Sequence, residues 1–153
     1  MKQLIIFLDI LLTGLIAGVI FGVWVGYNPQ YLTAATYVEQ QQHAIRSLNV
    51  LMPVLGLLSI ILTVTYAMMS KSHKLSRHLL FTAVVFLIFS GLITRFGNQP
   101  INAIMMTWDA GNIPPTWTTL REDWWMFHTM RMITSLIAFA LIVWVTINTT
   151  KLK

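Results

Sequence analysis

The chain alternates between long apolar stretches and shorter polar ones. Apolar runs cover residues 4–27, 48–69, 79–96 and 133–147, and the last extends back to Trp124 when its amphipathic turns are included. A helix needs roughly 20 residues to cross the hydrocarbon core of a bilayer. A membrane barrel would show many short alternating strands instead. The pattern therefore predicts an all-α, integral membrane four-helix bundle.

Polar segments extend two of these helices beyond the bilayer, on the same side. Residues 34–47 contain neither Pro nor Gly, so we expect the second helix to begin outside the membrane, with a kink at Pro53. Thr118 or Thr119 can cap the fourth helix. The expected helices are about 4–27, 35–69, 78–96 and 119–148, within a single transmembrane domain of residues 1–153.

Composition and charge agree with a membrane location and indicate an orientation. Hydrophobic residues make up 56% of the chain and charged residues only 10%, against about 25% charged residues in soluble domains. Basic residues gather at both termini and in the turn at 70–77. The positive-inside rule then places both termini in the cytoplasm, which we expect to be bounded by the plasma (inner) membrane. These charges flank helices without forming a patch, so we expect no nucleic-acid partner.

Two histidines lie where helices enter the membrane from the predicted outer side, and each is followed one turn later by an arginine. On the fourth helix, the spacing puts Trp124, His128 and Arg131 on one face. On the second helix, the same helical spacing puts Glu39, His43 and Arg46 on one face. Ionisable groups at membrane depth are costly and usually mark a site.

Several roles are open for these residues. His43 and His128 can bind haem or a mononuclear metal such as iron or copper, if the fold brings them together. Arginine suits a partly desolvated contact with an acidic group, so Arg46 can contribute to binding a substrate or haem propionates. Alternatively, the histidines form hydrogen bonds at headgroup level without a further role. The chain has no cysteine, which excludes thiolate ligands and cysteine nucleophiles.

The segment that runs into the last helix resembles the anthrone oxygenase-like membrane family. The resemblance rests on Asn98-x-Pro100-x-Asn102, a Trp-rich stretch, and Trp125-x-x-His128-x-x-Arg131. Characterised members of that family oxidise anthrones to anthraquinones with dioxygen. The resemblance implies His128 as a base, and Asn98, Asn102 or Arg131 as groups that stabilise an enolate oxygen.

Taken together, these features favour a membrane-embedded oxidoreductase or oxygenase that acts on a planar, lipophilic, phenolic or quinone-type substrate at the outer face. We expect the substrate to contact Arg46, Glu39, Trp125 and Trp124. A non-catalytic haem- or metal-binding membrane protein and a small-molecule binding module are the alternatives. The bilayer and a small lipophilic molecule are the expected partners. Gly14, Gly18, Gly22 and Gly26 form a smooth face that suits close helix packing, either within the chain or in a homodimer.

Overall fold

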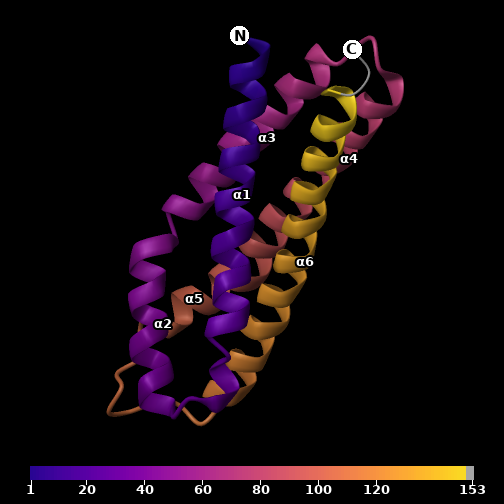
Figure 1. Ribbon diagram of the computed structural model, residues 1–153. Helices are drawn as coiled ribbons and strands as arrows, with labels where there is room; N and C mark the ends of the chain where they lie inside the picture. The colour runs from indigo at the N-terminus through magenta and orange to yellow at the C-terminus, as the bar shows by residue number, and fades with distance from the viewer. Residues whose placement is uncertain (151–153) are drawn as a thin grey trace.

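The protein is a bundle of four long helices with a smaller helical cap at one end. The computed structural model describes the backbone of residues 1–150 and the side chains of residues 1–148. The long helices are α1 (Lys2–Gly26), α3 (Leu51–Met69), α4 (Lys74–Ile93) and α6 (Trp117–Thr150). Figure 1 shows the start of α1 and the end of α6 at one end of the bundle, and α2 (Ala34–Leu48) and α5 (Gln99–Met105) at the other.

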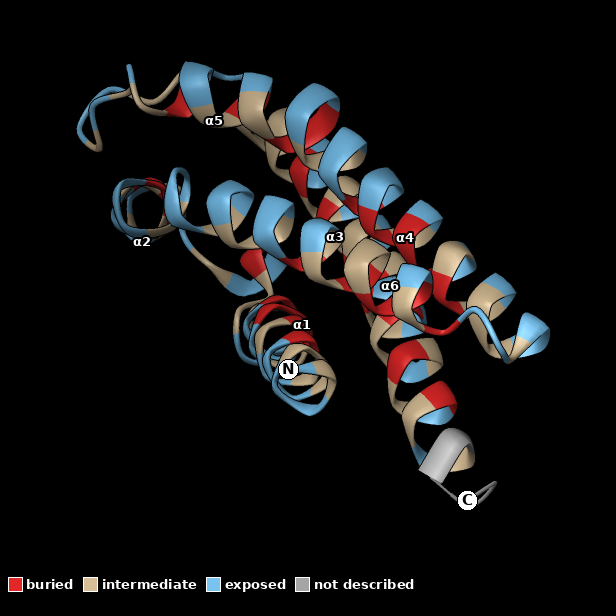
Figure 2. Cartoon of the chain, turned by 90° about the horizontal axis from the view of Figure 1, so that it is seen from above, coloured by how far each residue is buried: buried red, intermediate tan, exposed pale blue. Residues whose placement is uncertain are grey.

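The bundle presents apolar side chains to its surroundings. Four helical stretches are long and apolar enough to cross a membrane: Lys2–Tyr31, Leu51–Met69, Lys74–Met105 and Trp117–Asn148. In Figure 2, buried residues form stripes that face the bundle axis while the outer faces are exposed. Large side chains such as Phe7, Leu57 and Trp144 lie on those outer faces. A bilayer covers such a surface without cost. The prediction of an integral membrane four-helix bundle is confirmed.

Small residues allow close packing near the termini. Buried Ala67, Ala83 and Ala138 bring α3, α4 and α6 together around Tyr66 and Ile142. The glycine-lined face of α1 is largely free in the monomer. A Cβ atom added at Gly18, Gly22 or Gly26 would have no neighbour within 4 Å, whereas one at Gly14 would lie 3.2 Å from the ring of Phe139. Association of two copies through this face stays a prediction.

The predicted helix 35–69 is divided into α2 and α3 by a turn at Asn49 and Val50. Pro53 explains the position of this break. A proline has no N–H to donate to the carbonyl four residues earlier, and its ring crowds that carbonyl, which here belongs to Asn49. We expected Pro53 only to kink the helix, but the chain instead turns where the missing hydrogen bond falls.

The segment after residue 96 is helical, although the third helix was expected to end there. α4 continues through a wider π-helical turn, η2 (Thr94–Asn98), directly into α5. Pro100 lies at the start of α5, and a π-turn relieves the conflict between a proline and the preceding turn. Asn98 is therefore held within a continuous helical segment that packs against α6, and it is not part of a loop.

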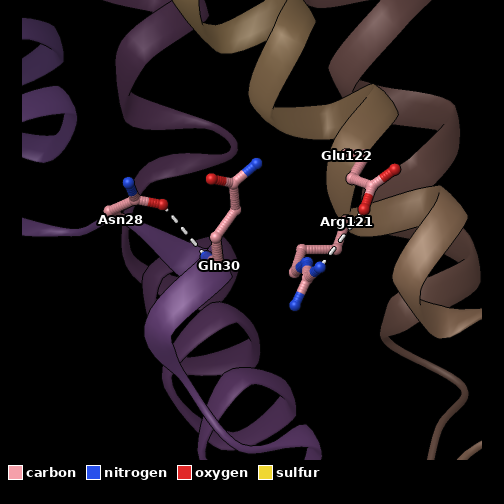
Figure 3. A network of polar contacts seen from close by, with 4 residues as sticks. All are labelled: Asn28, Gln30, Arg121 and Glu122. Atoms are coloured by element: carbon pink, nitrogen blue, oxygen red, sulfur yellow. Dashed lines mark hydrogen bonds and ion pairs between the residues drawn. The ribbon is translucent and has the colours of Figure 1, made fainter.

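The cap is held together by side chains that satisfy backbone groups. Gln42 on α2 donates to the carbonyls of Met105 and Trp108, at 3.0 and 2.8 Å, which ties α2 to the end of α5. Tyr37 is fully buried beneath α5, and burial raises the pKa of its phenol. Figure 3 shows two local contacts at this end, namely Asn28 with Gln30 in the turn η1 (Pro29–Tyr31), and the ion pair of Arg121 with Glu122 at 3.3 Å on α6.

The close approach of η2 to α6 requires glycine at position 97. A Cβ atom there would lie 2.5 Å from the ring of Phe127. We expect Gly97→Ala to lower the free energy of unfolding in detergent by about 1–3 kcal/mol, because the ring or the helix has to move. Gly91→Ala is the matched control, since an added Cβ there meets nothing within 4 Å. Equal unfolding midpoints for the two variants would contradict this packing.

Candidate functional site

His128 lies at the centre of the bundle near the cap, with no exposed surface. Its Nδ1 is 2.8 Å from Nη2 and 3.2 Å from Nε of Arg131. A guanidinium can only donate, so Nδ1 accepts and carries no proton. The other nitrogen, Nε2, therefore carries the proton and donates to the carbonyl oxygen of Ile20 on α1, 3.1 Å away. His128 is thus a neutral imidazole whose two nitrogens are both occupied.

Aromatic side chains enclose this imidazole. The ring of Trp124 stacks on it at 5.0 Å between centroids, and Trp125 stacks at 5.6 Å, both nearly parallel to it. Two asparagines hold Trp124 in place. Asn102 accepts the indole N–H at 2.9 Å, and Asn98 donates to the carbonyl of Trp124 at 3.0 Å. The residues of the resemblance therefore form one packed unit around His128.

A cavity of about 290 Å³ lies beside this unit, between α1, α2, the start of α3 and α6. This volume is near the lower end of the range for small-molecule sites. Its walls are mainly aliphatic and aromatic. Val19, Val23 and Tyr27 come from α1 and its end, Ile45 comes from α2, and Trp124 comes from α6. Asn102, Thr94 and Arg131 add polar groups on one side. The cavity suits a ligand that is mostly apolar with a few polar atoms.

Arg131 brings an uncompensated positive charge to the cavity. Among the described residues, the only ion pair joins Arg121 and Glu122, so Arg131 has no carboxylate partner. Within the described residues, its guanidinium donates hydrogen bonds through Nε and Nη2, and both go to His128. A guanidinium carries five N–H donors, and the remaining ones are available to a ligand in the cavity that Arg131 lines. Such a charge in an apolar setting favours an anionic or strongly polarised oxygen.

Two further polar atoms near the cavity have no partner. Tyr27 Oη and Gln41 Oε1 are buried and form no hydrogen bond within the described chain. Both residues line the cavity. Buried polar atoms are nearly always paired in native proteins. A phenolic ligand, which offers both a donor and an acceptor, would satisfy them.

The site lies toward the end of the bundle that carries α2 and α5. At about 1.5 Å per residue, Arg131 is roughly 28 Å along α6 from the end of the helix near the C-terminus. The hydrocarbon core is about 30 Å thick. Arg131 and His128 therefore lie toward the end of the bundle opposite the start of α1 and the end of α6, and their position at headgroup level stays a prediction.

The structure does not bring the second histidine to this site. The inward face of α2 is formed by Tyr37, Val38, Gln41 and Ile45. Glu39, His43 and Arg46 lie on its exposed face, and none of them lines the cavity. Arg46 contacts only Gln42, at 3.4 Å. A role for Glu39 and Arg46 in substrate binding stays a prediction.

The donor groups do not fit haem or a metal shared by His43 and His128. Both nitrogens of His128 are engaged by Arg131 and Ile20, and His43 is exposed on the far face of α2. Within residues 1–150, no group of three or more His, Cys, Asp or Glu side chains is placed to hold a metal ion. The paired-ligand hypothesis stays a prediction, and no chemical step is derived from it.

Sequence reasoning missed the part of the cavity contributed by α1 and by the inward face of α2. Tyr27, Gln41 and the carbonyl of Ile20 carry no local motif that distinguishes them. The carbonyl of Ile20 matters through its hydrogen bond to His128, and Tyr27 and Gln41 matter because they line the cavity. One signal was available for Gln41, because it shares a stripe with Tyr37, Val38 and Ile45 at helical spacing.

The hydrogen bond between His128 and Arg131 can be measured by a double-mutant cycle. We expect His128→Phe and Arg131→Met to show a coupling free energy of about 1–2 kcal/mol in reversible unfolding in mixed micelles. The control cycle pairs His128→Phe with Arg121→Met, since Arg121 contacts Trp117 and Glu122 instead. Coupling of similar size in both cycles would show that the bond is not formed.

Comparison with known proteins places the chain in a family. No curated protein and no solved structure matches it. The family model described as anthrone oxygenase matches residues 41–141. That range includes the second half of α2, the π-turn, α5 and the part of α6 that carries Trp124, His128 and Arg131. The match covers more than half of the chain, and the protein therefore belongs to the anthrone oxygenase family.

Proposed function

We propose that the protein is a membrane oxidoreductase that binds a planar, lipophilic phenol of the anthrone type in the cavity beside His128 and oxidises it with dioxygen. The observation that carries this proposal is the uncompensated guanidinium of Arg131 at the edge of an apolar cavity walled in part by Tyr27 and Trp124. Family membership supports the same reaction class.

The polar atoms of the cavity suit such a substrate. The oxygen of an anthrone lies on an otherwise apolar, flat ring system, and Arg131 offers donors to one such oxygen. A ring hydroxyl can donate to Gln41 Oε1, which is otherwise unpaired, and a second oxygen can accept from Tyr27 Oη. The apolar walls exclude water from the rings, which strengthens each of these contacts.

The arrangement of Arg131 and His128 indicates how the substrate is activated. The conjugate base of an anthrone carries its charge on oxygen, so a guanidinium at that oxygen stabilises the anion. His128 Nδ1 lies beside the same guanidinium. His128 itself does not line the cavity, so the step requires Arg131 to turn toward the substrate oxygen and uncover Nδ1. Nδ1 then has no donor and can accept the proton of the enol hydroxyl. His128 is thus the base of the proposal, and it acts on an O–H group.

Dioxygen is the only oxidant that this reaction needs, because it accepts the electrons and supplies the oxygen atom of the new carbonyl. The electron-rich anion transfers electrons to dioxygen, the ring methylene becomes a second carbonyl, and the remaining oxygen atom leaves as water with the two hydrogens removed from the substrate. The protein holds the anion, shields it and supplies the proton acceptor. Asn98 and Asn102 act as positioning residues in this scheme, because they fix Trp124 against the imidazole.

The distribution of charge supports an orientation for the site. Lys2, Lys71 and Lys74 belong to the end of the bundle that carries the termini. By the positive-inside rule, that end faces the cytoplasm and the cavity opens at the outer face. We take the membrane to be the plasma (inner) membrane. A lipophilic substrate would reach the cavity from the bilayer, in which it is concentrated.

Removal of the guanidinium tests the proposal directly. We expect Arg131→Gln to lower kcat/KM for a hydroxylated anthrone by about 100-fold in proteoliposomes, as loss of a group that stabilises an oxyanion does. The measurement is dioxygen uptake together with the absorbance of the quinone, corrected for autoxidation in empty liposomes. Arg121→Gln is the matched control on the same helix, since Arg121 does not line the cavity, and we expect a change of less than about twofold.

Two results would contradict the proposal. One is a rate for Arg131→Gln equal to that of the natural chain, with unchanged helix content by circular dichroism. The other is dioxygen uptake by the natural chain that does not exceed the rate in empty liposomes when the substrate is shown to be bound.

A further inference from the structure

A second cavity of about 230 Å³ lies next to the first, on the other side of Arg131. It is enclosed by residues of α1, α3, α4, η2 and α6. The two cavities share part of their lining, including Arg131 and Thr94. The proposed oxidation does not use the second cavity.

The second cavity is open between two transmembrane helices. Gly56 on α3 and Gly91 on α4 line it, and a Cβ atom added to either glycine would meet nothing within 4 Å. Leu57 and Gly91 are exposed on the outer surface of the bundle. The opening therefore faces the acyl chains of the bilayer.

The two ends of the cavity differ in polarity. Leu57, Ile60 and Leu87 line the end that lies deeper in the membrane. Thr94, Arg95 and Gln99 line the end next to α5, where η2 begins. An occupant that satisfies both ends has an apolar chain and a polar head.

Charge at the polar end identifies the kind of head. Arg95 lies roughly 31 Å along the helix from the start of α4, which puts it at the same membrane boundary as Arg131. Neither guanidinium has a carboxylate partner among the described residues. Two unneutralised arginines at headgroup level, beside a cleft between membrane helices, favour an anionic headgroup.

We propose that this cavity binds one anionic phospholipid, with its phosphate between Arg95 and Arg131 and one acyl chain in the cleft between α3 and α4. The lipid belongs to the leaflet on the side of α5. This site does not depend on the oxidation of any substrate. Because Arg131 lines both cavities, the phosphate and an oxygen in the first cavity would share its N–H donors.

Lipid retention measured by native mass spectrometry tests the site. The natural chain is released from mixed micelles that contain phosphatidylglycerol and phosphatidylcholine in equal amounts. We expect one phosphatidylglycerol to be retained per chain, in clear preference to phosphatidylcholine. Gly91→Leu fills the cleft and Arg95→Gln removes one charge, and each should weaken retention of phosphatidylglycerol by roughly tenfold.

Matched controls separate the cleft from the general surface. Gly22→Leu places the same side chain on an exposed face of α1 that lines neither cavity. Arg77→Gln removes an arginine at the opposite end of α4. Both controls should retain the lipid like the natural chain. Glycerol phosphate, which has the head without the chains, should not displace it.

Three outcomes would overturn the proposal. Equal retention of the two lipids by the natural chain would remove the preference for an anionic head. Unchanged retention in Gly91→Leu would place the lipid on the outer surface instead of the cleft. Equal losses in Arg95→Gln and Arg77→Gln would show a general effect of net charge.

Discussion

A neutral imidazole holds an arginine inside the helix bundle near its cap, and much of the protein is arranged around that contact. A guanidinium in an apolar environment normally pairs with a carboxylate. Here the Arg131 guanidinium is hydrogen-bonded to the uncharged His128 and lies over the ring of Trp124, and His128 is fixed in turn by a backbone carbonyl of α1. The charge is positioned without being neutralised, so it remains available to an oxygen that enters from either cavity.

This contact explains why several elements meet near the cap. α1 supplies the carbonyl of Ile20, which selects the tautomer of His128. The π-turn and α5 supply Asn98 and Asn102, which fix Trp124 against the imidazole. Gly97 lets the π-turn approach α6 closely enough for those contacts to form. The bundle near the termini, which is packed through alanines and aliphatic side chains, provides the rigid frame that such a site needs.

Local patterns in the sequence were sufficient for the membrane helices and for the α6 half of the site. Hydropathy is a local property, and the spacing of Trp124, His128 and Arg131 defines one helical face without reference to other elements. The π-turn was not predictable in this way. Pro100 indicated a break, but packing against α6 keeps the segment helical. His43 is exposed because α2 buries the face that carries Tyr37, Val38 and Ile45. The opposite face, which carries His43, is left at the surface.

The partners from α1 could not be predicted, because they depend on tertiary contacts. Tyr27 and the carbonyl of Ile20 acquire their roles only when α1 packs against α6. Every residue has a backbone carbonyl, so no residue type in the sequence marks the one that binds His128. The orphaned oxygens of Tyr27 and Gln41 are likewise visible only once the cavity exists.

The tautomer of His128 is the most direct test of this account. The measurement is solid-state ¹⁵N NMR at neutral pH on the protein in lipid bilayers, with labelled histidine and with His128→Gln to assign the signal. We predict a neutral ring with a protonated Nε2 and an unprotonated Nδ1 that accepts a hydrogen bond, and we predict that this Nδ1 signal changes in Arg131→Met. An imidazolium, or a ring protonated at Nδ1, would contradict the arrangement on which the site depends.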